Sequence, residues 1–161
     1  MARVLLVANR LPFTARRDAL GQLRLEASAG GLATGLREPH AAQDALWIGW
    51  SGSAEALEGP EQRELERELR ARRAVPVPLG SNELEAYYER VSNRLLWPLF
   101  HYDVDTCPLQ PRDWETYAEV NARFAEVVSQ HYRPGDRIWV HDYQLLLLPQ
   151  LLRQRLPEAS I

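Results

Sequence analysis

An arginine and a pair of glycines near the N-terminus have the residue types of an anion-binding site. Asn9 and Arg10 directly follow the apolar stretch Val4–Ala8, and Gly30 and Gly31 lie in a small-residue segment that leads into a predicted helix. Arginine is a permanently charged, forked donor that suits a phosphate, and the start of a helix presents unpaired backbone N–H groups. Each feature also has an ordinary explanation, as the polar end of a strand or as a simple turn. Together they predict a phosphate-binding rim formed by Arg10 and the two glycines.

Aromatic side chains gather in residues 87–102, together with hydroxyl and amide groups. Aromatic faces pack on the apolar C–H faces of a sugar ring, while polar groups bind its hydroxyls. An aromatic-rich helix buried in the core would have the same composition. The segment therefore predicts either a sugar pocket or a core helix.

A carboxylate follows the apolar stretch Ile138–His141. Asp142 comes directly after it, and ligands of open α/β sheets bind beyond the carboxyl ends of the strands. An aspartate there can bind hydroxyls or handle a proton, but aspartate also commonly caps a helix at such a junction. The position of Asp142 leaves both interpretations open.

Several other chemistries are excluded or disfavoured by composition. All 19 basic residues are arginine, so the chain has no lysine for a Schiff base or a Walker-type phosphate site. Ser53 replaces the last glycine that a nucleophile elbow around Ser51 would need. The single cysteine, Cys107, cannot form an internal disulfide and is read as a small buried hydrophobe. His131 has no second ligand at metal spacing, so we read it as a core or rim histidine and predict no metal or cofactor.

Short apolar or β-branched segments that alternate with helical patterns must position these groups. The predicted strands are Arg3–Ala8, Leu46–Trp50, Ala74–Leu79 and Arg137–His141, and the predicted helices span 61–73, 114–132 and 144–156. Strands that alternate with helices imply a Rossmann-like, mainly parallel α/β sheet with helices on both faces. Two prolines in the third strand, Pro76 and Pro78, place it at an edge of the sheet.

The bulk properties describe one globular domain, residues 1–161. A hydrophobic content of 45% supports a core, and a formal net charge of −3 gives no electrostatic reason to expect nucleic acid or an acidic membrane. No segment has the length of a membrane span or the pattern of a secretory signal. We therefore predict a cytoplasmic protein, and the sequence leaves open whether it forms a homo-oligomer.

Five motifs in order resemble the N-terminal half of the trehalose-6-phosphate synthase family, retaining glycosyltransferases with two facing Rossmann-like domains. The motifs lie at residues 8–12, 28–33, 47–52, 87–102 and 139–143 and span almost the whole chain. The resemblance implies glucose 6-phosphate as the acceptor and UDP-glucose as the usual donor. It places Arg10 on the acceptor phosphate, Tyr88 and Trp97 around the acceptor, Asp142 on an acceptor hydroxyl near the reacting carbon, and Gly30 and Gly31 near the donor.

The chain departs from the family pattern at two positions. Ala8 stands where the family usually has serine, and Gln144 stands where it usually has histidine. Gln144 keeps hydrogen-bonding capacity but cannot titrate, which affects any contact that supports Asp142. The segment between Pro12 and Ser28 is longer than a minimal loop, and we expect a mobile loop near the active cleft.

The resemblance also implies that a C-terminal domain, absent from this chain, holds most of the nucleotide. We therefore expect the chain alone to be inactive and to bind both sugars weakly. The alternatives are a relative that uses another acceptor, such as glycerol 3-phosphate, or ADP-glucose as donor, and a non-catalytic sensor of sugar phosphates.

Overall fold

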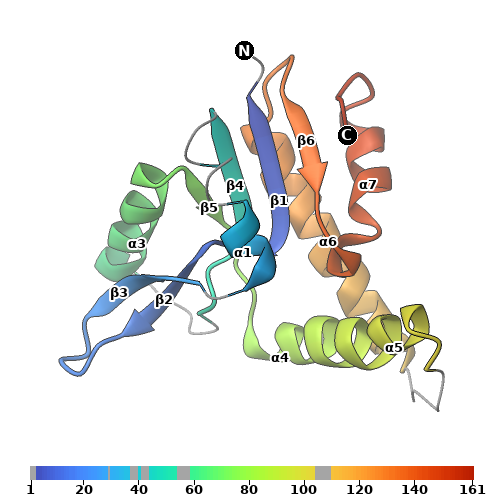
Figure 1. Cartoon of the computed structure of the whole chain (residues 1–161), viewed down its shortest axis with the longest axis horizontal. Coiled ribbons are helices and arrows are strands. Elements are labelled where there is room, and N and C mark those ends of the chain that lie inside the picture. The colour runs from blue at the N-terminus through green and yellow to red at the C-terminus, as the bar shows by residue number, and fades with distance from the viewer. Residues whose placement is uncertain (1–2, 29, 37–39, 41–43, 54–58, 104–109) are drawn as a thin grey trace.

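The computed structural model describes residues 3–28, 30–36, 40, 44–53, 59–103 and 110–161. Its centre is a parallel four-stranded sheet with the order β5-β4-β1-β6 (Figure 1). The strands are β1 (Val4–Arg10), β4 (Ala45–Trp50), β5 (Ala74–Pro76) and β6 (Arg137–Val140). All four predicted strands are present. The proline-containing strand β5 lies at an edge, as predicted. It is shorter than predicted and ends at Pro76, although the Val77 N–H still donates to the Gly49 carbonyl oxygen at 2.9 Å.

Helices join these strands. They are α1 (Gly31–Gly35), α3 (Gly59–Ala71), α4 (Ser81–Glu83), the π-helix Leu84–Leu96, α5 (Trp97–Phe100), α6 (Pro111–His131) and α7 (Leu148–Arg155). The helix predicted from residue 144 starts later, after the 3-10 turn Tyr143–Leu145. Pro149 explains the difference, because its ring would clash with the carbonyl group of Leu145 in a continuous helix.

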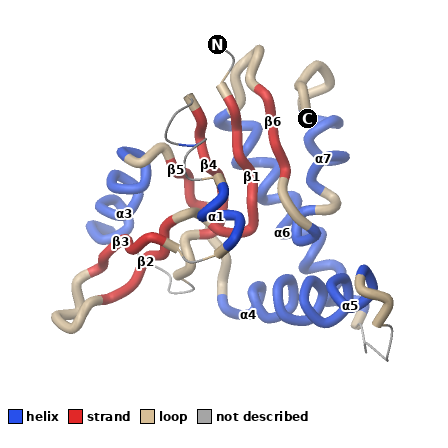
Figure 2. The backbone as a smooth tube through the Cα atoms, viewed as in Figure 1, coloured by secondary structure: helices blue, strands red, loops and turns tan. Residues whose placement is uncertain are grey.

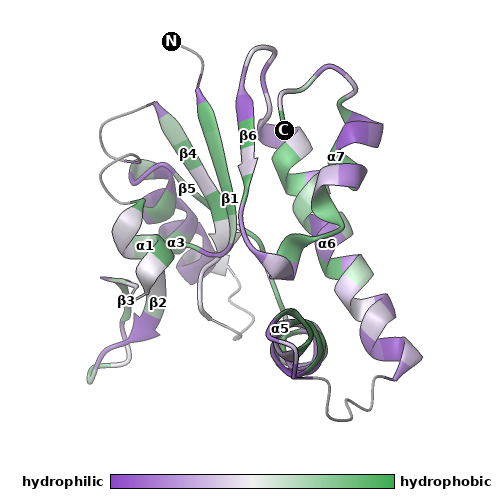
Figure 3. Cartoon of the chain, turned by 45° about the vertical axis from the view of Figure 1, so that its right-hand side comes forward, coloured by the Kyte–Doolittle hydropathy of each residue, from purple (hydrophilic) through white to green (hydrophobic). Residues whose placement is uncertain are grey.

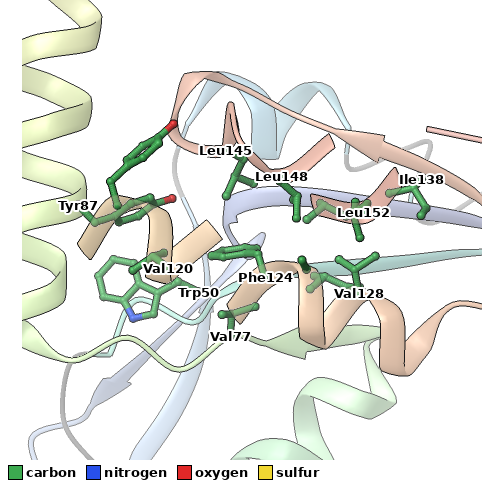
Figure 4. Close-up of a cluster of buried hydrophobic side chains, with 14 of the residues drawn as sticks. Trp50, Val77, Tyr87, Val120, Phe124, Val128, Ile138, Leu145, Leu148 and Leu152 are labelled. Atoms are coloured by element: carbon green, nitrogen blue, oxygen red, sulfur yellow. The ribbon is translucent and has the colours of Figure 1, made fainter. Parts of the chain in front are cut away.

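Helices cover both faces of the sheet, as predicted. Successive side chains of β1 point to opposite faces, and Leu5 and Val7 join one buried cluster whereas Leu6 and Ala8 join another. The first cluster includes residues of α6 and α7 (Figure 4), and the second includes Leu65 and Leu69 of α3. Figure 3 shows α6 and α7 on one side of the sheet and α3 on the other.

The segment predicted as a mobile loop between Pro12 and Ser28 is instead an antiparallel hairpin. It consists of β2 (Phe13–Arg17) and β3 (Leu23–Ala27), joined by a tight turn (Figure 2). The Asp18 carboxylate accepts backbone hydrogen bonds from Leu20 and Gln22 at 2.9 Å, which closes that turn. On one face of the hairpin, Leu23 and Leu25 pack against the buried cluster beneath α3. Apolar and charged residues do alternate in β3, but each strand is only five residues long, so the length of the segment alone suggested a loop.

Candidate functional site

A cavity of about 270 Å³ opens at the carboxyl edge of the sheet, where β1 and β6 end side by side. The π-helix and α5 run across this edge (Figure 1). The structure brings five of the six predicted site residues to the cavity: Arg10, Gly30, Gly31, Tyr88 and Asp142. The other residues that line it are Asn9, Leu11, Ser28, Leu32, Ala33, Trp47 and Gln144.

A bulge at the end of β1 orients Arg10. Between the pairs Val7–Ile48 and Arg10–Trp50, β1 has one more residue than β4, and such an insertion bends a strand and redirects its side chains. The bulge needs Gly49, because a Cβ atom there would lie 2.6 Å from the carbonyl oxygen of Ala8. Gly49, which belongs to the motif at residues 47–52, therefore shapes the site.

Two aromatic rings hold the Arg10 guanidinium at the mouth of the cavity. Its central carbon lies 4.8 Å from the ring centroid of Trp50 and 5.8 Å from that of Tyr88, within the range of cation–π attraction. Arg10 is exposed, and no carboxylate in the described part of the chain forms an ion pair with it. Its charge is available to an anionic ligand.

The π-helix places two adjacent tyrosines differently. Tyr87 is fully buried and its hydroxyl donates to Asn9 Oδ1 at 3.0 Å, whereas Tyr88 lines the cavity. Burial raises the pKa of Tyr87 well above its usual value, so this hydroxyl stays protonated and keeps its donor role. The bond orients the Asn9 amide at the cavity wall. Residues 87–102 thus place one tyrosine in the core and the next at the cavity.

The Gly30–Gly31 turn begins the short helix α1 and has open space around it. Gly30 has φ 148°, and a Cβ atom at either glycine would meet nothing within 4 Å. No side chain caps α1, and its first turn holds no acidic residue. The turn can therefore approach a ligand closely. Ala29 of the same motif lies outside the described residues.

Asp142 caps the turn that follows it and also lines the cavity. Its carboxylate accepts a hydrogen bond from the Tyr143 backbone at 2.8 Å, as a cap of the following turn, and it also lines the cavity. Its backbone has φ 76° and ψ 165°, a region that only glycine normally adopts. A non-glycine residue in this conformation is strained by about 1–3 kcal/mol. Such strain is typical of functional sites.

Trp97 is the one predicted site residue that does not line the cavity. It is half exposed on α5, where its ring lies 3.9 Å from that of His101 and 5.5 Å from that of Tyr143. Trp97 therefore contacts the residue that follows Asp142, and neither Trp97 nor Tyr143 lines the cavity. The position of Trp97 could not be predicted from the sequence. It stands where the π-helix gives way to α5, and the direction of its side chain depends on this change of helix type.

Sequence reasoning did not select Trp47 and Gln144 as site residues. Trp47 is fully buried and its Nε1 donates to the Arg10 carbonyl oxygen at 3.1 Å, which stabilises the bulge. Gln144 lies two residues after Asp142, a spacing that could have revealed it. Cys107 lies outside the described residues, and His131 has its Nδ1 2.9 Å from the Val127 carbonyl oxygen. In the ranges that the structure describes, no cluster of three potential metal ligands is present.

The parallel sheet with helices on both faces defines the chain as a Rossmann-like α/β domain, with a cavity at the carboxyl edge of its sheet. The family model described as glycosyltransferase family 20 matches residues 2–161, and the chain belongs to that family. It is 40% identical to α,α-trehalose-phosphate synthase (UDP-forming) 1 of Aspergillus niger, over 99% of this chain and 31% of that protein. It is also 40% identical to a trehalose-6-phosphate synthase of Mycolicibacterium vanbaalenii, over 99% of this chain and 33% of that protein.

Solved structures agree with this assignment. An α,α-trehalose-phosphate synthase (UDP-forming) from Burkholderia xenovorans, in complex with glucose-6-phosphate, superposes with a TM-score of 0.71 at 28% identity. The match covers 98% of this chain and 32% of that one. A structure from E. coli bound with UDP-2-fluoro glucose superposes with a TM-score of 0.66 at 29% identity, over 96% of this chain and 30% of that one.

The chain thus spans about a third of the length of these proteins and corresponds to their N-terminal part. The motif-based resemblance and the parallel-sheet fold are both confirmed. Among the described residues, no helix is long and apolar enough to cross a membrane.

Proposed function

We propose that residues 1–161 form the acceptor-side domain of a retaining glucosyltransferase, which moves glucose from UDP-glucose to glucose 6-phosphate and makes trehalose 6-phosphate. The observation that carries the proposal is the exposed Arg10 guanidinium beside an aromatic and hydroxyl-lined cavity that the carboxylate of Asp142 also lines. A ligand that binds both side chains must carry an anionic group and hydroxyl groups. The relatives named above support the particular sugar phosphate and donor.

In this proposal Arg10 binds the acceptor phosphate, because a fixed guanidinium forms strong charge-assisted hydrogen bonds with phosphate oxygens. Tyr88 packs on the sugar ring, and Trp97 extends the same wall. Asp142 accepts a hydrogen bond from the acceptor hydroxyl that attacks. The Gly30–Gly31 turn lies near the donor phosphates, where a Cβ atom would narrow the approach.

The proposed reaction needs no covalent intermediate on the protein. The acceptor oxygen forms a bond to the anomeric carbon on the face from which UDP departs, and the hydroxyl proton passes to the leaving phosphate oxygen. The domain contributes orientation and stabilisation of charge rather than a nucleophile. Because the nucleotide needs a second domain, we expect the 161-residue chain alone to show no measurable transfer and to bind either sugar weakly. We assign the reaction to the cytoplasm, which the single cysteine supports.

The test is a titration of glucose 6-phosphate against the wild-type chain and Arg10→Ala. We expect the variant to bind at least about tenfold more weakly, a loss of about 1.4 kcal/mol, because the phosphate loses its charged partner. Glucose without a phosphate should bind both proteins equally. Arg137→Ala is the matched control, since Arg137 is an exposed arginine at the opposite end of the sheet.

Equal affinity of wild type and Arg10→Ala for glucose 6-phosphate would remove Arg10 from the site and with it the proposal. Product analysis separates the remaining alternatives. A protein that joins this chain to a nucleotide-binding domain is given UDP-glucose or ADP-glucose together with glucose 6-phosphate or glycerol 3-phosphate. Trehalose 6-phosphate from the first donor and first acceptor supports the proposal, and another product or none contradicts it.

A further inference from the structure

One side-chain atom at the cavity is buried without a partner. Gln144 is only 6% exposed and lines the same cavity as Arg10 and Asp142. Its side-chain oxygen, Oε1, has no hydrogen-bond partner within the part of the chain that the structure describes. Buried polar atoms are almost always hydrogen-bonded, because leaving one unpaired loses the bond that it made to water. An unpaired acceptor at a cavity wall therefore indicates a donor that comes from a ligand.

The segment that carries Gln144 is held rigidly by α6. The Tyr117 hydroxyl donates to the Tyr143 carbonyl oxygen at 2.8 Å and accepts from the Leu146 backbone at 3.1 Å. The Asn121 amide donates to the Gln144 carbonyl oxygen at 3.2 Å. These bonds fix the backbone on both sides of the glutamine. The backbone that carries the Gln144 side chain is thus set in place before a ligand binds, which lowers the entropy cost of binding.

The other buried unpaired side-chain atoms in the described residues belong to Asp113, Asn121 and His141. None of these residues lines the cavity. Among these four residues, only Gln144 has its unpaired atom in a residue that lines the cavity, where a ligand could supply the missing hydrogen bond.

The chemistry of the atom limits what it can bind. An amide oxygen only accepts hydrogen bonds, so it is repelled by ionised phosphate oxygens and attracted by a hydroxyl group. It accepts without adding negative charge beside Asp142 and does not titrate. Arg10 has the opposite preference, for an anion. The cavity wall therefore distinguishes the phosphate from the hydroxyls of one ligand.

We propose that Gln144 is a specificity-determining residue, whose Oε1 accepts a hydrogen bond from one ring hydroxyl of the sugar phosphate bound in this cavity. This inference rests on the proposed function, since it takes the ligand to be a phosphorylated sugar. It adds a residue that selects against acceptors in which this hydroxyl is missing, because an apolar C–H in its place leaves the buried oxygen unpaired.

The experiment measures binding of glucose 6-phosphate and of its 1-, 2-, 3- and 4-deoxy analogues to the 161-residue chain. The test variant is Gln144→Met, which keeps the length of the side chain and removes the acceptor. Gln130→Met is the matched control, an exposed glutamine on α6. Gln144→His retains a neutral acceptor and tests for rescue, and Arg10→Ala tests the proposed function in parallel.

We expect the wild-type chain to bind one deoxy analogue at least about tenfold more weakly than glucose 6-phosphate. In Gln144→Met this ratio should fall to about one, while the ratios for the other analogues persist. Gln144→His should recover part of the discrimination, and Gln130→Met should behave as wild type. A thermal melt of ligand-free Gln144→Met should show an equal or higher Tm, since an apolar group replaces an unpaired acceptor.

The inference is overturned if Gln144→Met keeps every deoxy ratio of the wild type, even when its overall affinity falls, because a purely structural role would lower all affinities alike. That result leaves the proposed function intact when Arg10→Ala still weakens glucose 6-phosphate. If the wild type does not bind glucose 6-phosphate, or if Arg10→Ala binds it equally, the proposed function itself fails. The two failures are therefore distinguishable.

Discussion

The two ends of the central sheet carry the same pair of residue types and use them in opposite ways. At the amino end, Arg3 precedes β1 and Asp136 precedes β6, and their side chains form a double hydrogen bond at 2.6 and 3.3 Å. At the carboxyl end, Arg10 closes β1 and Asp142 follows β6, yet no ion pair joins these two residues. Both line a cavity instead.

Backbone geometry produces the difference. At the amino end, the Arg137 N–H donates to the Arg3 carbonyl oxygen at 3.0 Å, so regular pairing brings the arginine and Asp136 together. At the carboxyl end, the bulge in β1 and the left-handed backbone of Asp142 interrupt regular pairing. The Arg3–Asp136 ion pair thus stabilises the fold, whereas Arg10 and Asp142, which form no ion pair with each other, remain available to a ligand.

The largest expected effect is a loss of stability when the Arg3–Asp136 ion pair is broken. Asp136→Ala should lower the free energy of unfolding by about 3 kcal/mol, because it leaves the largely buried Arg3 guanidinium without its carboxylate. Glu64→Ala, which removes the exposed partner of Arg67 on α3, should cost about 1 kcal/mol or less. Urea unfolding measures the loss in both variants. A loss for Asp136→Ala no larger than that for Glu64→Ala would show that the Arg3–Asp136 pair contributes no more than a surface ion pair.

Loss of Arg10 at the carboxyl end should affect binding much more than stability. Arg10→Ala should change the free energy of unfolding by less than about 1 kcal/mol, since Arg10 is exposed and loses only two cation–π contacts. The same variant is expected to lose affinity for glucose 6-phosphate. Urea unfolding beside the titration separates the two effects, and a large loss of stability would show that Arg10 belongs to the scaffold.

Strain at Asp142 gives a third test. Asp142→Gly and Asp142→Ala both remove the carboxylate and its bond to the Tyr143 backbone, but only glycine adopts φ 76° without strain. We expect the glycine variant to be more stable than the alanine variant by about 1 kcal/mol. Both should bind glucose 6-phosphate more weakly than wild type. Equal stability of the two variants would mean that the backbone is relaxed.

The smallest expected effect is on pH dependence. Burial lowers the pKa of His141, at the end of β6, and also lowers the pKa of His40. The unfolded chain therefore binds more protons than the folded chain just below pH 6.5, and stability should fall as the pH drops through this range. Carboxylates with lowered pKa, such as Glu83 beside Arg123, add their loss only below about pH 4.5.

Urea unfolding at pH 7.5 and 5.5 measures the histidine contribution. His141→Leu should reduce the decrease in stability between these two pH values, because this variant no longer takes up a proton on unfolding at position 141. An unchanged decrease would assign the dependence to His40 or to other groups.

Much of the scaffold could be predicted from the sequence, because buried strands and amphipathic helices have local patterns. The core strands, α3 and α6 were found within a few residues, and the edge position of β5 followed from its prolines. The β2–β3 hairpin was missed because each of its strands is only five residues long, although apolar and charged residues alternate in β3. Helix α7 begins at Leu148 rather than at the predicted residue 144 because of Pro149. The effect of a proline on a helix is local, so this boundary could have been predicted from the sequence.

The candidate site was only partly predictable. Arg10, Gly30 and Asp142 could be selected because each stands where a predicted strand or turn ends. The partnership of Tyr87 with Asn9, the support that Trp47 gives to Arg10 and the unpaired oxygen of Gln144 all depend on contacts between distant segments. No local pattern of residues encodes such contacts.

The sequence by itself determined the alternating α/β architecture and the motifs that identify the family. Its lack of lysine also excluded chemistry that needs a lysine side chain. Tertiary structure alone decided which charged groups pair and which stay open, because that depends on a bulge and a strained backbone at the ends of two neighbouring strands. It also decided that Trp97 packs against Tyr143 and that Gln144 lines the cavity, since helix packing sets the direction in which each side chain points.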